Sequence, residues 1–133
     1  MSYLKAKVTG IHNHENLNIV HFDFNGTSLA MMSLDLCLDI KINSFVKLAA
    51  KPSHVAIAKS FDGQISYSNQ LSCTVEDIEN GKLLSVLKLK LDEDAYLHSI
   101  ITLNSSKKMD LKVGDEITAF IKASELSIVE VLQ

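Results

Sequence analysis

Arginine and tryptophan are both absent from this chain of 133 residues. All 13 basic residues are lysines, aromatic residues make up 6%, and the formal net charge is −3. Proteins that bind nucleic acid usually present a basic face and contact bases with arginine and aromatic side chains. The composition therefore argues against nucleic acid as a partner.

Proline occurs only once and cysteine twice. With hydrophobic residues at 47%, a chain so poor in proline is expected to fold. Cys37 and Cys73 are isolated and form no metal-type pair, which favours two buried thiols in a reducing compartment. No apolar run approaches the ~18 residues of a membrane span, and the N-terminus lacks the pattern of a secretory signal. We therefore expect a cytoplasmic protein with no membrane partner.

Alternating apolar residues, interrupted by turn signals, predict five strands in the second half of the chain. These strands lie within residues 71–79, 82–91, 95–102, 113–124 and 125–132. Asn80-Gly81 is a good hairpin dipeptide between the first two of them. The segment NSSKKMDL, 104–111, predicts one short helix between the third and fourth strands, with Asn104 or Ser105 as its N-cap.

The first half of the chain shows the same order of elements. Its predicted strands span residues 4–12, 17–24, 27–33, 44–53 and 54–60, with a turn or short helix over 34–40. Asn25-Gly26 is a hairpin dipeptide between the second and the third of these strands. Equivalent positions are Val8 and Val75, Ile11 and Ile78, Ser33 and Thr102, and Lys51 and Lys122. The stretches AKPSHV and IKASEL both place a lysine two residues before a serine. The sequence therefore predicts an internal duplication.

Five strands with a helix between the third and the fourth are typical of an OB-like barrel. We predict an all-β fold of two OB-like five-stranded barrel units, each with one short helix, at residues 1–60 and 66–133. A polar, glycine-containing linker separates the two units. A unit of roughly 65 residues buries little surface by itself, so we expect the units to pair or the chain to oligomerise.

Three separated motifs in the second half resemble one known family. They are SYSNQLSCTVEDIENG around the first strand, SIITLNS at the end of the third, and LKVGDEITAFIKASELSIV over the last two. In this order they resemble the molybdenum-pterin-binding (Mop) or TOBE family over nearly all of residues 69–133. The first half is similar mainly through FVKLAAKPSHVAIA. Two such units in one chain, without a DNA-binding domain, resemble a di-Mop molbindin.

The resemblance implies a non-enzymatic protein that binds molybdate or tungstate and carries no organic cofactor. It also implies an OB-like fold, homo-oligomers assembled from swapped or intimately packed units, and oxyanion sites between units. A trimer is the first expectation and a dimer the second. The chemistry is reasonable, because a tetrahedral dianion has only acceptor oxygens and suits hydroxyls, backbone N–H groups and a cation in a rigid frame.

By resemblance, the oxyanion-binding residues are Ser68, Thr102, Ser105, Lys122, Ala123 and Ser124 in the second unit and Ser33, Lys51 and Ser53 in the first. Ser68 stands where the family has an arginine, and Pro52 removes a backbone donor from the first unit. The second-unit sites are therefore expected to be the more competent. Each residue also has a structural explanation: Ser105 as a helix cap, Lys122 as a solvated charge and Thr102 as an ordinary strand residue.

We predict a cytoplasmic protein that binds molybdate, tungstate or a similar oxyanion for storage or homeostasis of the metal. The alternative is a ligand-independent oligomerisation or regulatory module of a molybdate transporter or a transcription regulator. An OB-fold that binds single strands is disfavoured by the charge and the few aromatics. His12 and His14, beside Glu15, lack the further ligands of a closed zinc site, so a plain surface loop is favoured there.

Overall fold

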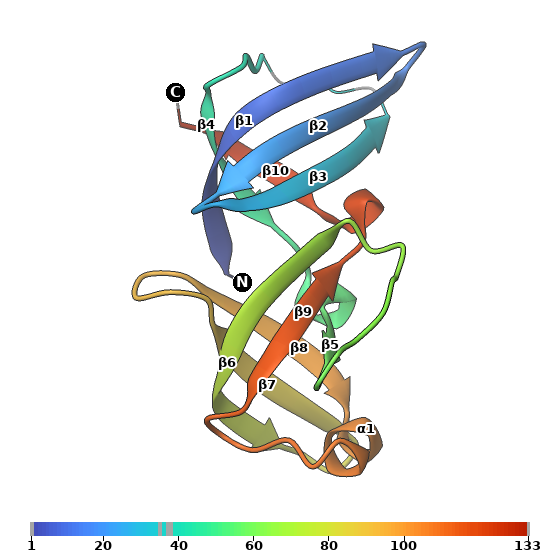
Figure 1. Ribbon diagram of the computed structural model, residues 1–133, viewed down its shortest axis with the longest axis vertical. Coiled ribbons are helices and arrows are strands. Elements are labelled where there is room, and N and C mark those ends of the chain that lie inside the picture. The colour runs from blue at the N-terminus through green and yellow to red at the C-terminus, as the bar shows by residue number, and fades with distance from the viewer. Residues whose placement is uncertain (1, 35, 37–38, 133) are drawn as a thin grey trace.

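Two five-stranded antiparallel sheets make up the protein and lie one above the other along its long axis (Figure 1). The computed structural model describes residues 2–34, 36 and 39–132. The strands are β1 (Tyr3–His14), β2 (Leu17–Phe24), β3 (Thr27–Leu34), β4 (Phe45–Ala49), β5 (Ala56–Ala58), β6 (Asn69–Asn80), β7 (Leu84–Lys90), β8 (Tyr96–Thr102), β9 (Glu116–Ile121) and β10 (Ser127–Val131). The helical elements are α1 (Leu103–Lys108) and two 3-10 turns, η1 (Pro52–His54) and η2 (Ala123–Glu125).

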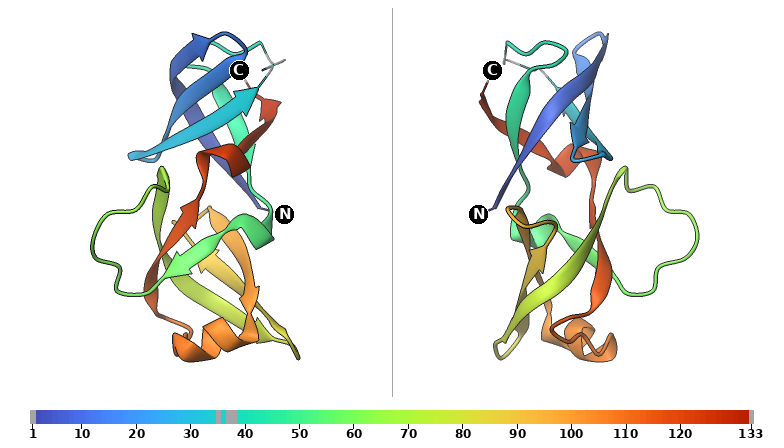
Figure 2. Two further views of the ribbon diagram at one scale, coloured as in Figure 1. Left: turned by 90° about the vertical axis from the view of Figure 1, so that its right-hand side faces the viewer. Right: turned by 60° about the vertical axis from the view of Figure 1, so that its left-hand side comes forward.

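The fifth strand of each half of the chain belongs to the sheet of the other half. Sheet A has the order β10-β4-β1-β2-β3, and sheet B has the order β5-β9-β6-β7-β8. Thus β5 leaves the first half to pair with β9, and β10 leaves the second half to pair with β4 (Figures 1 and 2). The boundaries 1–60 and 66–133 remain a prediction about the sequence repeat, because neither half builds a complete sheet alone.

The predicted all-β fold class, with two OB-like five-stranded units, is confirmed. Local turn chemistry agrees with it: Asn25 and Gly26 have φ angles of 48° and 91°. Positive φ at both central residues is what a two-residue hairpin turn of type I′ requires, and asparagine and glycine tolerate it best. The turn therefore joins β2 to β3 as the sequence indicates.

The predicted helix between the third and fourth strands exists in the second half as α1. Its N-cap is Thr102 and not Asn104 or Ser105, because the Thr102 backbone is still extended and its hydroxyl accepts the Ser105 N–H at 3.1 Å. In the first half, the described residues between β3 and β4, 36 and 39–44, are not helical. Residues 35, 37 and 38 lie outside the described part, and so does the predicted burial of Cys37.

The first strand continues two residues beyond its predicted end at His12, so the surface loop predicted around His12 and His14 is wrong. Both lie in the last third of β1 and pair with Ile19 and Leu17 of β2. Residues 12–14 are polar and exposed, so the apolar alternation that predicts a strand is lost in this segment. The strand therefore places both imidazoles on the same face, two residues apart.

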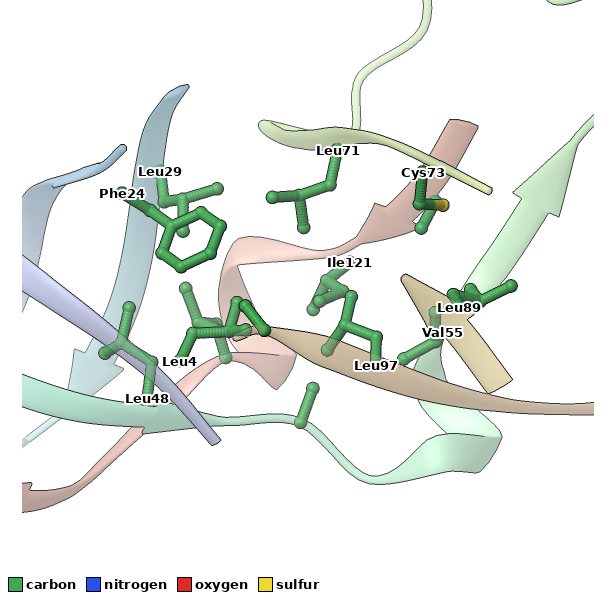
Figure 3. Close-up of a cluster of buried hydrophobic side chains, with 14 of the residues drawn as sticks. Leu4, Phe24, Leu29, Leu48, Val55, Leu71, Cys73, Leu89, Leu97 and Ile121 are labelled. Carbon is green, nitrogen blue, oxygen red and sulfur yellow. The ribbon is translucent and has the colours of Figure 1, made fainter. Parts of the chain in front are cut away.

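One hydrophobic cluster runs through both sheets and through the contact between them (Figure 3). Leu4 and Leu29 of sheet A lie on one side of this contact, and Leu71 and Ile121 of sheet B on the other. All four side chains are at most 2% exposed. Because the cluster is continuous, the two sheets share a core instead of joining as independent domains.

Strand register confirms most of the repeat and corrects one pair of positions. Both long strands carry a bulge at the same place, directly after Val8 and Val75, so these two residues are equivalent. In β3, however, Leu34 pairs with Leu17 of β2. In β8, Thr102 pairs with Leu84 of β7, the counterpart of Leu17.

The counterpart of Thr102 is therefore Leu34, and Ser33 corresponds to Ile101. A shift of one residue in a strand moves a side chain to the opposite face of the sheet. The equivalence of Ser33 and Thr102 is thus wrong, although this does not test whether Ser33 contacts a ligand.

Candidate functional site

The two lysine turns are the most closely matched part of the repeat. Lys51 and Lys122 have nearly identical backbone angles, φ −65° and ψ 140° against φ −64° and ψ 146°, and each precedes a 3-10 turn. His54 N–H donates to the Lys51 carbonyl at 2.8 Å, and Glu125 N–H donates to the Lys122 carbonyl at 2.9 Å. Pro52 fits the first position of η1, where no N–H partner is needed. Each turn ends a strand of one sheet and directs the chain to the other sheet.

Each lysine turn packs on the third strand of the other half. The turn η2 contacts β3, and η1 contacts β8, where the Ser99 hydroxyl donates to the Val55 carbonyl at 2.6 Å. Next to the first of these contacts, the Asn69 side chain links β3 to the end of β9. Its amide donates to the carbonyls of Ala30 and Ile121, both at 3.0 Å, and its oxygen accepts the Ala30 N–H at 2.7 Å.

Asn69 is fully buried and was not predicted as important from the sequence. The signal that could have found it is an asparagine at an inward position of an alternating strand, directly before Gln70 and Leu71. A buried amide needs hydrogen-bond partners, so such a residue usually has a structural or functional role.

The two turns also face each other, and we call residues 51–54 and 122–125 together the double turn. His54 Nδ1 lies 3.1 Å from Glu125 Oε2. A groove of about 290 Å³ beside this pair is lined by Lys51 and Ser124 as well. The structure therefore brings together predicted residues of both units, although the pair His54 and Glu125 was not foreseen.

The predicted residues Thr102 and Ser105 form a separate group at the start of α1. The Thr102 hydroxyl donates to Ser105 Oγ at 2.9 Å, and both side chains are exposed. The Thr102 hydroxyl caps the helix by accepting the Ser105 N–H, and the Ser105 hydroxyl accepts the bond from Thr102. We call this group the helix-cap pair.

One chain does not bring the helix-cap pair to the double turn. Thr102 pairs with Leu84, near the end of β6, whereas Ile121 pairs with Asn69 at its beginning. Because β6 has 12 residues, its two ends are separated by up to about 35 Å of strand. Figure 1 shows the same separation, with α1 at one end of sheet B and η2 at the other. Exposed Ser68 directly precedes Asn69 and so lies at the Lys122 end.

The remaining predicted residues have less distinctive surroundings. Ala123 is half-buried in η2, and Ser53 is exposed in η1. Ser33 is half-buried in β3, with its hydroxyl donating to the Leu34 carbonyl at 3.2 Å.

Titratable and metal-ligating groups do not indicate catalytic chemistry. Burial raises the pKa of the Cys73 thiol to about 12, which confirms a buried, neutral thiol at that position. Within the described ranges, no three His, Cys, Asp or Glu side chains are arranged to hold a metal ion. No helix in the part of the chain that the structure describes is long and apolar enough to cross a membrane.

Comparisons with known proteins agree with this architecture. A family model described as the TOBE domain matches residues 65–128. The chain is 34% identical to a probable molybdenum-pterin-binding protein from Haemophilus influenzae over 65 residues, which are 49% of this chain and 94% of that protein. The structure of the cytoplasmic molybdate-binding protein ModG, with molybdate bound, is similar to this one with a TM-score of 0.88 and 24% sequence identity. The match covers 95% of this chain and 93% of the ModG chain. The likeness to ModG is one of fold.

The exchanged sheets and the repeated lysine turns define a two-unit, OB-like protein. The chain belongs to the molybdenum-pterin-binding (Mop) family of TOBE-domain proteins. The resemblance of its second half to this family is thereby confirmed. It is a family of binding proteins and not of enzymes.

Proposed function

We propose that the protein binds molybdate or tungstate and acts in storage or homeostasis of the metal in the cytoplasm. The observation that carries this proposal is the matched geometry of Lys51 and Lys122, each followed two residues later by an exposed serine. Proteins with similar sequence or fold are named for binding molybdate or molybdenum-pterin, and ModG is described as cytoplasmic.

The surroundings of the Lys51 and Lys122 side chains support an anionic ligand. Both side chains are exposed, and among the described residues neither ammonium group takes part in an ion pair. Five other lysines are paired with carboxylates at 3.2 to 3.7 Å. An unneutralised ammonium beside a hydroxyl can make charge-assisted hydrogen bonds to a dianion, which are about twice as strong as neutral ones.

A complete site is proposed to need a second chain. The helix-cap pair and the double turn lie at opposite ends of β6, so both can contact one anion only if different chains supply them. Large apolar side chains adjoin the helix-cap pair: Leu83 is 80% exposed and Leu84 51%. Apolar surface of this kind is expected to be covered by a partner. We propose a homo-oligomer, with a trimer as the first candidate and a dimer as the second.

The alternative function is a ligand-independent oligomerisation or regulatory module. Two observations favour it: Pro52 has no N–H to offer an anion, and Glu125 adds a carboxylate beside the groove. Both would weaken a site in the double turn and leave the fold intact.

Calorimetric titration of phosphate-free protein with molybdate, tungstate and sulfate distinguishes the two functions, with the solution mass measured in the same buffer. We expect micromolar or tighter binding of molybdate and tungstate, about −8 kcal/mol or better, and no binding of sulfate. Absence of heat and of any thermal shift with all three anions would favour the ligand-independent module.

The variant Lys122→Ala tests the placement of the site. A hydrogen bond to a charged group contributes about 1.5–3 kcal/mol, so molybdate affinity should fall roughly 10- to 100-fold. Lys90→Ala is the matched control, because this lysine already pairs with Glu93 at 3.7 Å. Equal affinities for the two variants would show that the double turn is not the site.

A further inference from the structure

Two histidines lie close together on the outer face of sheet A, one on each strand of the β1–β2 hairpin. His21 of β2 pairs with Gly10 of β1, and the next outward residue of β1 is His12. Because side chains alternate along a strand, both imidazoles stand on one face of the sheet. His14 follows on that face and is exposed.

The two rings lie close enough to share one ion. Their centroids are 5.4 Å apart, with an interplanar angle of 78°. With N–metal bonds of about 2.0–2.1 Å and tetrahedral angles, two imidazoles on one ion have centroids about 5 Å apart. The observed separation is therefore compatible with one ion between the two rings, once the side chains rotate to direct a nitrogen of each ring at it.

Gly10 provides the space between the rings. A Cβ atom at this position would lie 3.5 Å from His12 Nε2 and 3.6 Å from His21 Cδ2, the carbon bonded to Nε2 in that ring. The Nε2 edge of His12 and the Cβ–Cδ2 side of His21 thus border the same space, which the missing side chain leaves open. The backbone bulge just before Gly10 is of the kind that turns side chains at functional sites.

The second half of the chain shows that the fold does not require these residues. Its bulged strand has Asp77 and Glu79 at the positions of Gly10 and His12, and Lys88 at the position of His21. Lys88 pairs with Glu76 at 3.5 Å and lies over the Tyr96 ring, which is an ordinary surface arrangement. The imidazole pair is therefore particular to the first half and independent of the common scaffold.

We propose that His12 and His21 form a binding site for a first-row divalent metal ion, with water completing the coordination. Imidazole suits copper, nickel and zinc, and Cu²⁺ forms the most stable complexes of the three. Two protein ligands agree with the absence of a three-residue metal cluster within the described ranges.

The test is calorimetric titration of the untagged full chain with Cu²⁺, Ni²⁺ and Zn²⁺ in a non-coordinating buffer free of molybdate. We expect one ion per chain, with Cu²⁺ bound most tightly. Loss of an outer-shell partner of a metal ligand lowers metal affinity roughly 10- to 100-fold. His12→Gln and His21→Gln remove the proposed ligands themselves, so each should weaken Cu²⁺ binding by at least as much. His12 is exposed and His21 half-buried, so thermal unfolding without metal checks that both substitutions leave the fold intact.

His98→Gln is the matched control, because this imidazole lies in sheet B and hydrogen-bonds Ser2 Oγ at 2.6 Å. Its Cu²⁺ affinity should equal that of the natural chain. His14→Gln separates two forms of the proposed site: unchanged affinity supports two ligands, and a comparable loss supports three imidazoles. Absence of saturable binding, or equal affinities in the His12, His21 and His98 variants, would overturn the proposal.

Discussion

One buried side chain, Asn69, links β3 of sheet A to β9 of sheet B, and replacing it gives a quantitative test of the structure. Asn69 has no exposed surface and makes three hydrogen bonds, two with the Ala30 backbone and one with the Ile121 carbonyl. In Asn69→Ala, the Ala30 N–H and the carbonyls of Ala30 and Ile121 lose their hydrogen bonds to the amide. A buried polar group left without a partner costs about 1–3 kcal/mol.

Three such groups without partners would lower the free energy of unfolding by at least about 3 kcal/mol. Partial access of water will relieve some of them, so we expect a loss of about 3 kcal/mol or a little more for Asn69→Ala. For a chain of this size, that corresponds to a fall in Tm of roughly 10 °C. The measurement is denaturant unfolding followed by circular dichroism, at one fixed protein concentration because any oligomer couples concentration to stability.

Gln70→Ala is the control for this experiment. Gln70 is the next residue of β6, is exposed, and makes one side-chain hydrogen bond, to the Tyr67 carbonyl at 3.1 Å. It should cost less than about 1 kcal/mol. A loss below about 1 kcal/mol for Asn69→Ala, or equal losses in both variants, would refute the role assigned to Asn69 in joining the sheets.

Two further predictions concern reactivity and assembly. Because the Cys73 pKa is raised to about 12, only about one thiol in ten thousand is ionised at pH 8. In a Cys37→Ser background, a thiol reagent should therefore react slowly with the folded protein and rapidly in denaturant. Fast reaction of the folded protein would contradict the burial of Cys73. Residues 66–133 expressed alone should form dimers, because β10 has lost β4 and can pair with β9 of a second copy. Light scattering that showed a stable folded monomer would mean that strand exchange is not required.

Much of the local structure is predictable from the sequence. The strand predicted at 17–24 matches β2 residue for residue, and the Asn25-Gly26 turn follows it as expected. The equivalence of Lys51 and Lys122 is also visible, because the same short pattern ends an apolar run in both halves. These features depend on alternation and turn chemistry, which act over a few residues.

Predictions that required register were less successful. Ser33 was matched with Thr102 by residue type, but the number of residues in the hairpins places Leu34 there. The strand predicted at 4–12 continues to His14, and this extension was missed because residues 12–14 are polar and exposed, so the apolar alternation is lost there. In both cases hydrogen bonding between strands decides the outcome, and composition carries little information about it.

The sequence by itself determined that the chain is a duplicated all-β protein with a lysine turn in each half. Only the tertiary structure decided where those turns lie. An apolar strand such as β5 or β10 specifies which of its faces is buried, but several strand edges can accept its backbone hydrogen bonds. Packing around the shared core selected the edge in the other half, and this exchange brought Lys51 and Ser124 to one groove while leaving Thr102 at the far end of β6.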